Sequence, residues 1–132
     1  VLLSFGEIDC RANEGIIPYH LKTKESLEKI IKDTVNDYLI YTSDILKSHH
    51  LRFTYLTLPA PIIKEKNIEN SLRVKTIKIF NDTLKNITQQ LKLHIVDTYS
   101  LTIDKNNESN MKYMCDEYHL SPEILEKLKF DF

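Results

Sequence analysis

Residues 53–61 read Phe-Thr-Tyr-Leu-Thr-Leu-Pro-Ala-Pro, and this stretch is the clearest indication of a buried strand in the chain. Its first six residues are aromatic, β-branched or leucine, which is typical of a strand that is buried on both faces. The prolines end the strand, because proline has no backbone N–H to donate to a sheet. We therefore predict a buried strand over residues 53–58, followed by a loop at the carboxyl edge of a sheet.

Amphipathic helices are predicted on both sides of this strand. In the first helix, which we expect to start at a cap on Thr23, apolar residues recur with the helical period of 3.6. These residues are Leu27, Ile30, Ile31, Val35, Tyr38, Leu39 and Leu46. In the second helix, between residues 69 and 91, apolar residues step by three and four. These residues are Ile77, Phe80, Leu84, Ile87 and Leu91.

The apolar run of residues 1–5 and the stretch of residues 94–99 are predicted to be strands, and a last helix is predicted to begin at the cap Ser121. Residues 7–22 show no sustained period and are predicted to form a loop. Strands that alternate with helices indicate a parallel sheet with helices on both faces. We predict one α/β domain over residues 1–132, with three layers in the order α/β/α.

The composition argues against several kinds of partner. The chain has 132 residues, of which 18 are basic and 19 acidic, and its net charge of -1 gives no electrostatic reason to bind nucleic acid or an anionic membrane. No apolar run is long enough to span a membrane. Cys10 and Cys115 fit neither a zinc site nor a disulfide framework, so we expect free thiols in the reducing cytoplasm. We expect no metal and no cofactor, and a small molecule as the partner.

Three loops are predicted to meet at the carboxyl edge of the sheet, where ligands bind in open parallel sheets: residues 6–11, residues 59–66 and the stretch before Ser121. Residues 6–11 read Gly-Glu-Ile-Asp-Cys-Arg, and residues 116–122 read Asp-Glu-Tyr-His-Leu-Ser-Pro. An Asp followed three residues later by His can place the carboxylate against one imidazole nitrogen and leave the other nitrogen free. By itself this motif is weak, because a solvated surface loop can contain it by chance.

The two loops together resemble the SGNH, or GDSL-like, hydrolases. Residues 6–11 resemble a variant of that superfamily's third sequence block, which usually reads Gly-x-Asn-Asp, and residues 116–122 resemble its fifth block. The resemblance implies a flavodoxin-like fold and a serine-type acylhydrolase, or esterase, that acts on carboxylic esters, with carbohydrate O-acyl esters as one substrate class. It implies that His119 is the general base, that Asp116 orients it, and that Gly6, Glu7 and Asp9 belong to the oxyanion and substrate region.

The family's Gly-Asp-Ser block, which carries the nucleophile, is not visible in this sequence. By resemblance we therefore expect the chain to be the C-terminal fragment of such a domain, without its N-terminal strands. We expect the isolated fragment to be inactive on esters. We also expect it to self-associate through the strand from Val1 to Phe5, because that strand would have an unpaired apolar edge.

Ile8 is the main departure from the family pattern, because it stands where the common block has an oxyanion-binding Asn and has no side-chain donor. Arg11, held by Glu7 or Asp9, is the candidate replacement; alternatively, Arg11 only braces the loop. Three functions remain open: a serine esterase or O-acyltransferase, a non-catalytic module of the same fold, and a thiol-based domain that uses the two cysteines.

Overall fold

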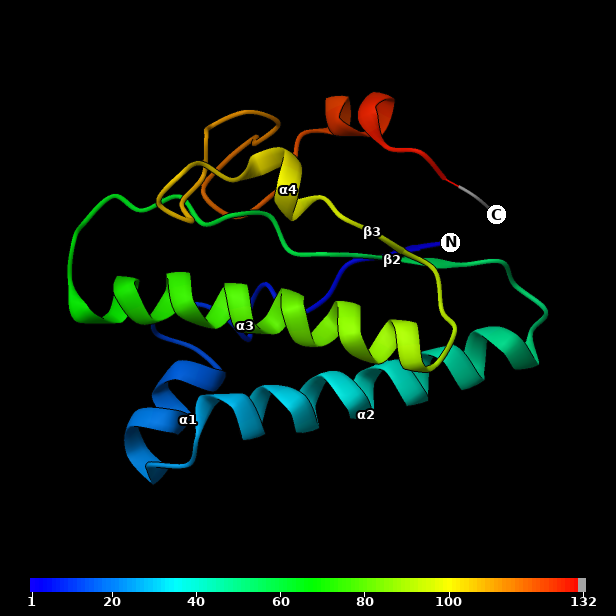
Figure 1. Cartoon of the computed structure of the whole chain (residues 1–132), viewed down its shortest axis with the longest axis horizontal. Helices are drawn as coiled ribbons and strands as arrows, with labels where there is room; N and C mark the ends of the chain where they lie inside the picture. Colours follow the sequence, from blue (N-terminus) through cyan, green and yellow to red (C-terminus); the bar gives the residue numbers. More distant parts are fainter. Residues whose placement is uncertain (131–132) are drawn as a thin grey trace.

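The computed structural model describes residues 1–130 and contains a three-stranded parallel sheet in the order β1-β2-β3 (Figure 1). Strand β1 (Leu2–Leu3) pairs with β2 (Thr54–Leu56), and β2 pairs with β3 (Ile95–Val96). The predicted α/β class and parallel pairing are confirmed. The strands are shorter than the stretches that predicted them, so only two or three residues of each stretch form regular strand.

Two long helices connect the strands: α2 (Leu27–Ser48) joins β1 to β2, and α3 (Ile68–Gln90) joins β2 to β3. Both helices lie on the same side of the strands in Figure 1. Two crossovers of the same hand that step across a sheet in the same direction place their helices on one face. Within residues 1–130, the helices on the opposite side are the short α4 (Tyr99–Thr102) and η1 (Pro122–Lys127), joined by loops, so the third layer is thinner than predicted (Figure 1).

The prediction of a loop over residues 7–22 is wrong in its second half, where helix α1 (Ile16–Thr23) forms. Ile16 and Ile17 are buried and attach this short helix to the core. Two adjacent apolar residues show no helical period, so the spacing of apolar residues does not indicate the helix. Pro18 lies in the first turn, where the helix needs no N–H donor from it.

Helix α2 begins four residues later than the predicted cap at Thr23, which instead ends α1. Lys24 adopts a left-handed conformation, with φ of 63°, that terminates α1. The hydroxyl of Ser26 then accepts a hydrogen bond from the backbone N–H of Lys29 and caps α2. Residues 24–26, which separate the two helices, are polar and interrupt no apolar position, so the spacing of apolar residues does not reveal the break.

Two further boundaries differ from the prediction. The strand predicted over residues 94–99 ends at Val96, and α4 begins at Tyr99; the carboxylate of Asp97 accepts a hydrogen bond from the backbone N–H of Ser100 in the turn between them. The C-terminal helix forms as the 3₁₀ helix η1, and the predicted cap Ser121 is confirmed by its bond from the N–H of Glu123. No helix within residues 1–130 is both long and apolar enough to cross a membrane.

The core lies between the sheet and the two long helices. The ring of Phe5 stacks on Tyr38 of α2 at a centroid distance of 3.5 Å, and it meets Tyr55 and Phe80 edge-on. Such aromatic contacts contribute about 0.5–1.5 kcal/mol each beyond area burial. The segment after β1 is therefore fixed to both long helices and to the central strand, and the loop that follows it starts from a defined position.

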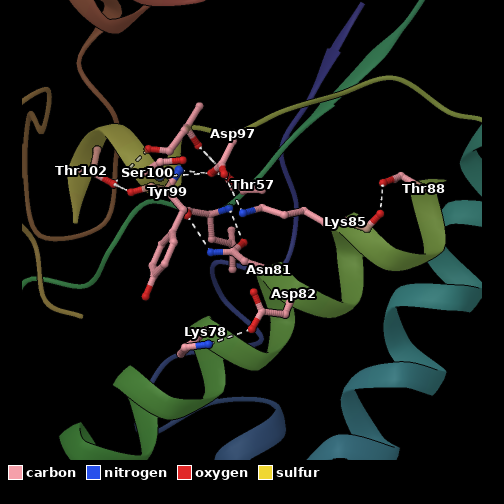
Figure 2. A network of polar contacts seen from close by, with 12 residues as sticks. Thr57, Lys78, Asn81, Asp82, Lys85, Thr88, Asp97, Tyr99, Ser100 and Thr102 are labelled. Carbon is pink, nitrogen blue, oxygen red and sulfur yellow. Dashed lines mark hydrogen bonds and ion pairs between the residues drawn. The ribbon is translucent and has the colours of Figure 1, made fainter. Parts of the chain in front are cut away.

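A buried polar network fixes the loop after β2 (Figure 2). Asn81 of α3 is fully buried, and its side chain accepts a hydrogen bond from the N–H of Leu58 and donates one to the C=O of the same residue. Thr57 donates to Asp97, which also pairs with Lys85 of α3 at 2.6 Å. Burial alone would raise the pKa of Asp97, but the bonds from Lys85 and Ser100 outweigh burial and lower it.

We predict that Asn81→Leu lowers the free energy of unfolding by about 2–4 kcal/mol, because it leaves the N–H and C=O of Leu58 buried without partners. Asn86→Leu, at an exposed position of the same helix, is the matched control and should change stability by less than about 0.5 kcal/mol. Urea unfolding followed by circular dichroism measures both values. Equal stability of the two variants would show that Asn81 does not hold the loop.

Candidate active site

An open groove of about 590 Å³ lies at the carboxyl ends of β1 and β2. Its lining includes Gly6, Glu7 and Asp9 from the loop after β1, and His119 from the loop before η1. Arg11 and Asp116 do not line the groove, but each forms a hydrogen bond to a residue that does. The six residues singled out in the sequence thus lie in or beside one groove.

The predicted contact between Asp116 and His119 is present. The Nδ1 atom of His119 lies 2.7 Å from Oδ2 of Asp116. The other carboxylate oxygen, Oδ1, accepts hydrogen bonds of 2.8 Å from the backbone N–H groups of Tyr118 and His119. An Nδ1–H that donates to a carboxylate leaves the lone pair of a neutral ring on Nε2. No hydrogen bond to Nε2 is present among residues 1–130.

The same three hydrogen bonds determine the acidity of Asp116. The bond to the His119 side chain has the largest effect, and with the two backbone bonds it lowers the pKa of Asp116 to about 2. The carboxylate therefore remains charged at any pH at which His119 could act as a base. The pair is open to water, with 54% of the Asp116 side chain and 64% of the His119 side chain exposed.

The two residues between Asp116 and His119 anchor the pair to the rest of the fold. Glu117 pairs with Lys64 at 2.7 Å and with Arg73 at 3.5 Å. The hydrogen bond from Lys64 is the main reason that the pKa of Glu117 is lowered. The ring of Tyr118 lies 4.3 Å from the guanidinium carbon of Arg11 and 4.9 Å from that of Arg73. Glu117 and Tyr118 both contact the buried Arg73, so the loop that carries the exposed Asp–His pair is attached to α3.

Arg73 is a functional candidate that was missed in the sequence. It lies on α3, only 5% of its surface is exposed, and it donates a hydrogen bond to the C=O of Ile62 in addition to its contacts with residues 117 and 118. Arg73 stands four residues before Ile77, on the apolar face of the predicted helix. A charge on that face is the signal that could have found it, because a buried arginine needs partners.

Gly6 shapes the loop that forms one wall of the groove. Its φ is 92°, a conformation that side chains rarely adopt, and a Cβ placed on it would lie 2.2 Å from the ring of Phe80. The loop then closes with hydrogen bonds from the N–H of Cys10 to the C=O of Gly6 and from the N–H of Arg11 to the C=O of Ile8. The block therefore needs its glycine for both the turn and the contact with α3.

Arg11 forms a bidentate pair with Glu7: Nε donates to Oε1 at 2.8 Å, and Nη2 donates to Oε2 at 2.9 Å. Its remaining nitrogen, Nη1, lies 3.8 Å from Glu14. The hydrogen bond to Glu7 is the main cause of the raised pKa of Arg11. This arrangement corresponds to the bracing role that the sequence left open, while Ile8 is 58% exposed and offers no donor.

The two cysteines are free and lie in different environments. Cys10 is fully buried, and burial, with the nearby Asp9 and Glu7, raises the pKa of its thiol well above the usual range. Cys115 is exposed, and its thiol donates to the C=O of Leu120. In the described part of the chain, no group of three or more His, Cys, Asp or Glu side chains is placed to hold a metal ion.

The fold and groove define an α/β protein with an Asp–His pair at the carboxyl edge of its sheet. No model of a known protein family matches the chain, and no curated protein sequence matches it. Among solved structures, it is similar to a Bacteroides fragilis protein described as a "putative acylhydrolase", with a TM-score of 0.54 and 24% sequence identity. The match covers 72% of this chain and 46% of that protein, so the chain spans about half of its length.

We predict that His119→Phe raises the pKa of Asp116 from about 2 toward 3.8 without reaching it, because the two backbone hydrogen bonds remain. A ¹³C NMR titration of the carboxyl carbon measures the shift, with His49→Phe as the control. Since the pKa is lower in the folded chain, Asp116 stabilises the fold fully above pH 3.8, and this contribution is lost as the pH falls toward 2. An unchanged pKa in His119→Phe would contradict the contact.

A second prediction concerns Tyr118. Replacement by Leu removes two cation–π contacts worth about 0.5–1 kcal/mol each and should loosen the loop between Asp116 and His119. The ¹⁵N shifts of the His119 ring should then show less of the tautomer with the proton on Nδ1. Tyr41→Leu, on the exposed surface of α2, is the control and should leave these shifts unchanged. Identical tautomer populations in both variants would show that Tyr118 does not position the histidine.

Proposed function

We propose that this chain carries the base half of the active site of a serine-type acyl-ester hydrolase. The hydrogen bond between Asp116 and His119, beside an open groove, is the observation that carries the proposal. The α/β fold, which is similar to that of a protein described as a "putative acylhydrolase", supports it. The SGNH-like assignment rests on the two sequence blocks at residues 6–11 and 116–122.

In the proposed reaction, Nε2 of His119 removes the proton of a serine hydroxyl while the serine oxygen attacks the ester carbonyl. Asp116 keeps the Nδ1 proton in place and stabilises the imidazolium that forms. The imidazolium then gives its proton to the departing alkoxide, and an acyl-enzyme remains. Water, activated by the same nitrogen, releases the carboxylic acid; an acceptor hydroxyl in place of water would make the reaction an O-acyl transfer.

The proposal requires a nucleophile from outside this sequence. Within residues 1–130, no serine hydroxyl and no thiol is hydrogen-bonded to the His119 ring. Ser4 lines the groove but directly follows β1 and lacks the Gly-Asp-Ser context, so we do not assign it the role. We propose that an upstream segment of the same polypeptide supplies the serine next to Nε2.

The oxyanion donors are proposed to come from the backbone. The N–H groups of Glu7, Ile8 and Asp9 make no hydrogen bond to any other group among residues 1–130. They belong to the loop that lines the groove, and unpaired N–H groups of this kind bind a developing oxyanion well. Arg11 is the weaker candidate, because two of its nitrogens are already bonded to Glu7.

The groove favours a neutral ester. Its apolar lining comes from Phe5, Ile8, Leu56 and Leu120. Its two acids are Glu7, which Arg11 neutralises, and Asp9, which forms no ion pair among the described residues. A free carboxylate in the groove repels an anionic substrate, so esters of small acyl groups, including those on carbohydrates, are the proposed substrates.

The test uses a polypeptide that contains both this chain and the proposed serine-bearing segment. In it, we predict that His119→Gln and Asp116→Asn each lower kcat for p-nitrophenyl acetate by about 10³–10⁴-fold or more. KM should change little, because both residues act mainly in the transition state. His49→Gln and Asp37→Asn remove the same groups from exposed sites on or next to α2 and should leave kcat within about twofold.

Two results would overturn the assignment. Full activity in His119→Gln would show that another residue is the base. A joined polypeptide that neither hydrolyses the ester nor reacts with a fluorophosphonate probe would favour the non-catalytic module, for which the missing donor at Ile8 is the supporting observation.

A further inference from the structure

A second hollow lies at the opposite end of the sheet, where β2 and β3 begin. It has a volume of about 380 Å³ and is lined by residues from the end of α2, the loop before β2 and the loop before β3. These residues are Lys47, Leu51, Arg52, Phe53, Lys92, Leu93 and His94. We call it the basic hollow, because every permanently charged residue in its lining is a cation.

The basic hollow carries a local excess of positive charge, although the overall charge of the chain is -1. Two stretches without any Asp or Glu, residues 45–64 and residues 83–96, meet at this end of the sheet. The side chains of Lys47, Arg52 and Lys92 form no ion pair among residues 1–130. Other exposed lysines, such as Lys32 and Lys75, also form no ion pair among these residues, but Lys47, Arg52 and Lys92 line the same hollow.

Helix electrostatics explain only part of this cluster. Lys47 lies in the last turn of α2, where a cation stabilises the partial negative charge of the helix end. Arg52 and Lys92 lie beyond the helix ends, in the loops that lead into β2 and β3, and are exposed. Three cations around one hollow repel one another, and an anion bound between them removes that repulsion.

The rest of the lining is apolar. Phe53 and Leu93 are half-buried and also pack against the core, and Leu51 is exposed. An inorganic anion would contact the cations but leave these side chains in water. An anion attached to an apolar group would cover them as well, and each buried methylene contributes about 0.8 kcal/mol.

We propose that the basic hollow binds a small phosphate monoester that carries an apolar group. A phosphate monoester is close to doubly charged at neutral pH, and so compensates three cations better than a carboxylate or sulfonate does. The planar guanidinium of Arg52 can bond two phosphate oxygens at once, while Lys47 and Lys92 act as point charges. The ligand lies at the amino edge of the sheet, so this proposal does not depend on the proposed ester hydrolysis at the carboxyl edge.

The test uses phenyl phosphate as the probe, with inorganic phosphate and benzenesulfonate as comparison ligands, in ¹⁵N NMR titrations of this chain at pH 7.5. Saturable shifts are expected at the amides of Phe53, Lys92 and Leu93. Phenyl phosphate should bind at least about fivefold more tightly than either comparison ligand, because only it combines two charges with a ring.

The double variant Arg52→Gln/Lys92→Gln should weaken the binding of phenyl phosphate by at least about tenfold. Its matched control, Lys32→Gln/Lys75→Gln, removes two exposed, unpaired lysines from the long helices and should change affinity by less than about twofold. Circular dichroism should show the same fold for both. Leu51→Ser should reduce the preference for phenyl phosphate over inorganic phosphate.

Three outcomes would overturn the proposal: equal binding of phenyl phosphate and inorganic phosphate, equal loss of affinity in the two double variants, or shifts that do not saturate and spread over all exposed lysines. The first would show that the apolar lining plays no part. The other two would show that the chain attracts anions only through its general surface charge.

Discussion

The parallel pairing of β1 with β2 and of β2 with β3 is the constraint on which the other features depend. Parallel strands send all their carboxyl ends to one edge and all their amino ends to the other, so loops that are distant in sequence meet at each edge. The carboxyl edge gathers the groove with Gly6 and His119, and the amino edge gathers the basic hollow. One topology thus gives the molecule two chemically different ends.

The Asp–His pair depends on residues that are not part of it. A carboxylate and an imidazole on an exposed loop gain little from each other alone, because water competes for both. Glu117 and Tyr118 lie between them in the sequence and contact the buried Arg73 of α3. Arg11, fixed by Glu7, lies over the same tyrosine ring. Contacts with α3 and with the loop after β1 therefore fix the position of the Asp–His pair.

Much of the fold could be predicted from the sequence because its strongest signals are local. The two long helices follow from the spacing of apolar residues, and the central strand follows from residues 53–61. Helix α1 could not be found in this way, since two buried isoleucines in so short a helix set no period. The division between α1 and α2 depends on the left-handed Lys24, a conformation that no residue pattern specified.

For the candidate site, the sequence by itself determined the types of residue and their spacing: a glycine after a buried strand, and an aspartate three residues before a histidine. That spacing made the hydrogen bond between Asp116 and His119 possible, because three residues bring the two side chains within reach of each other. Only the tertiary structure decided that Arg11 pairs with Glu7, that Arg73 anchors the loop, and that Lys47, Arg52 and Lys92 surround one hollow. Arg73 and the residues of the hollow contact elements that are distant in the sequence, and Arg11 has several acids nearby. Which of these contacts form depends on how the packed core orients each element, and the local sequence does not specify it.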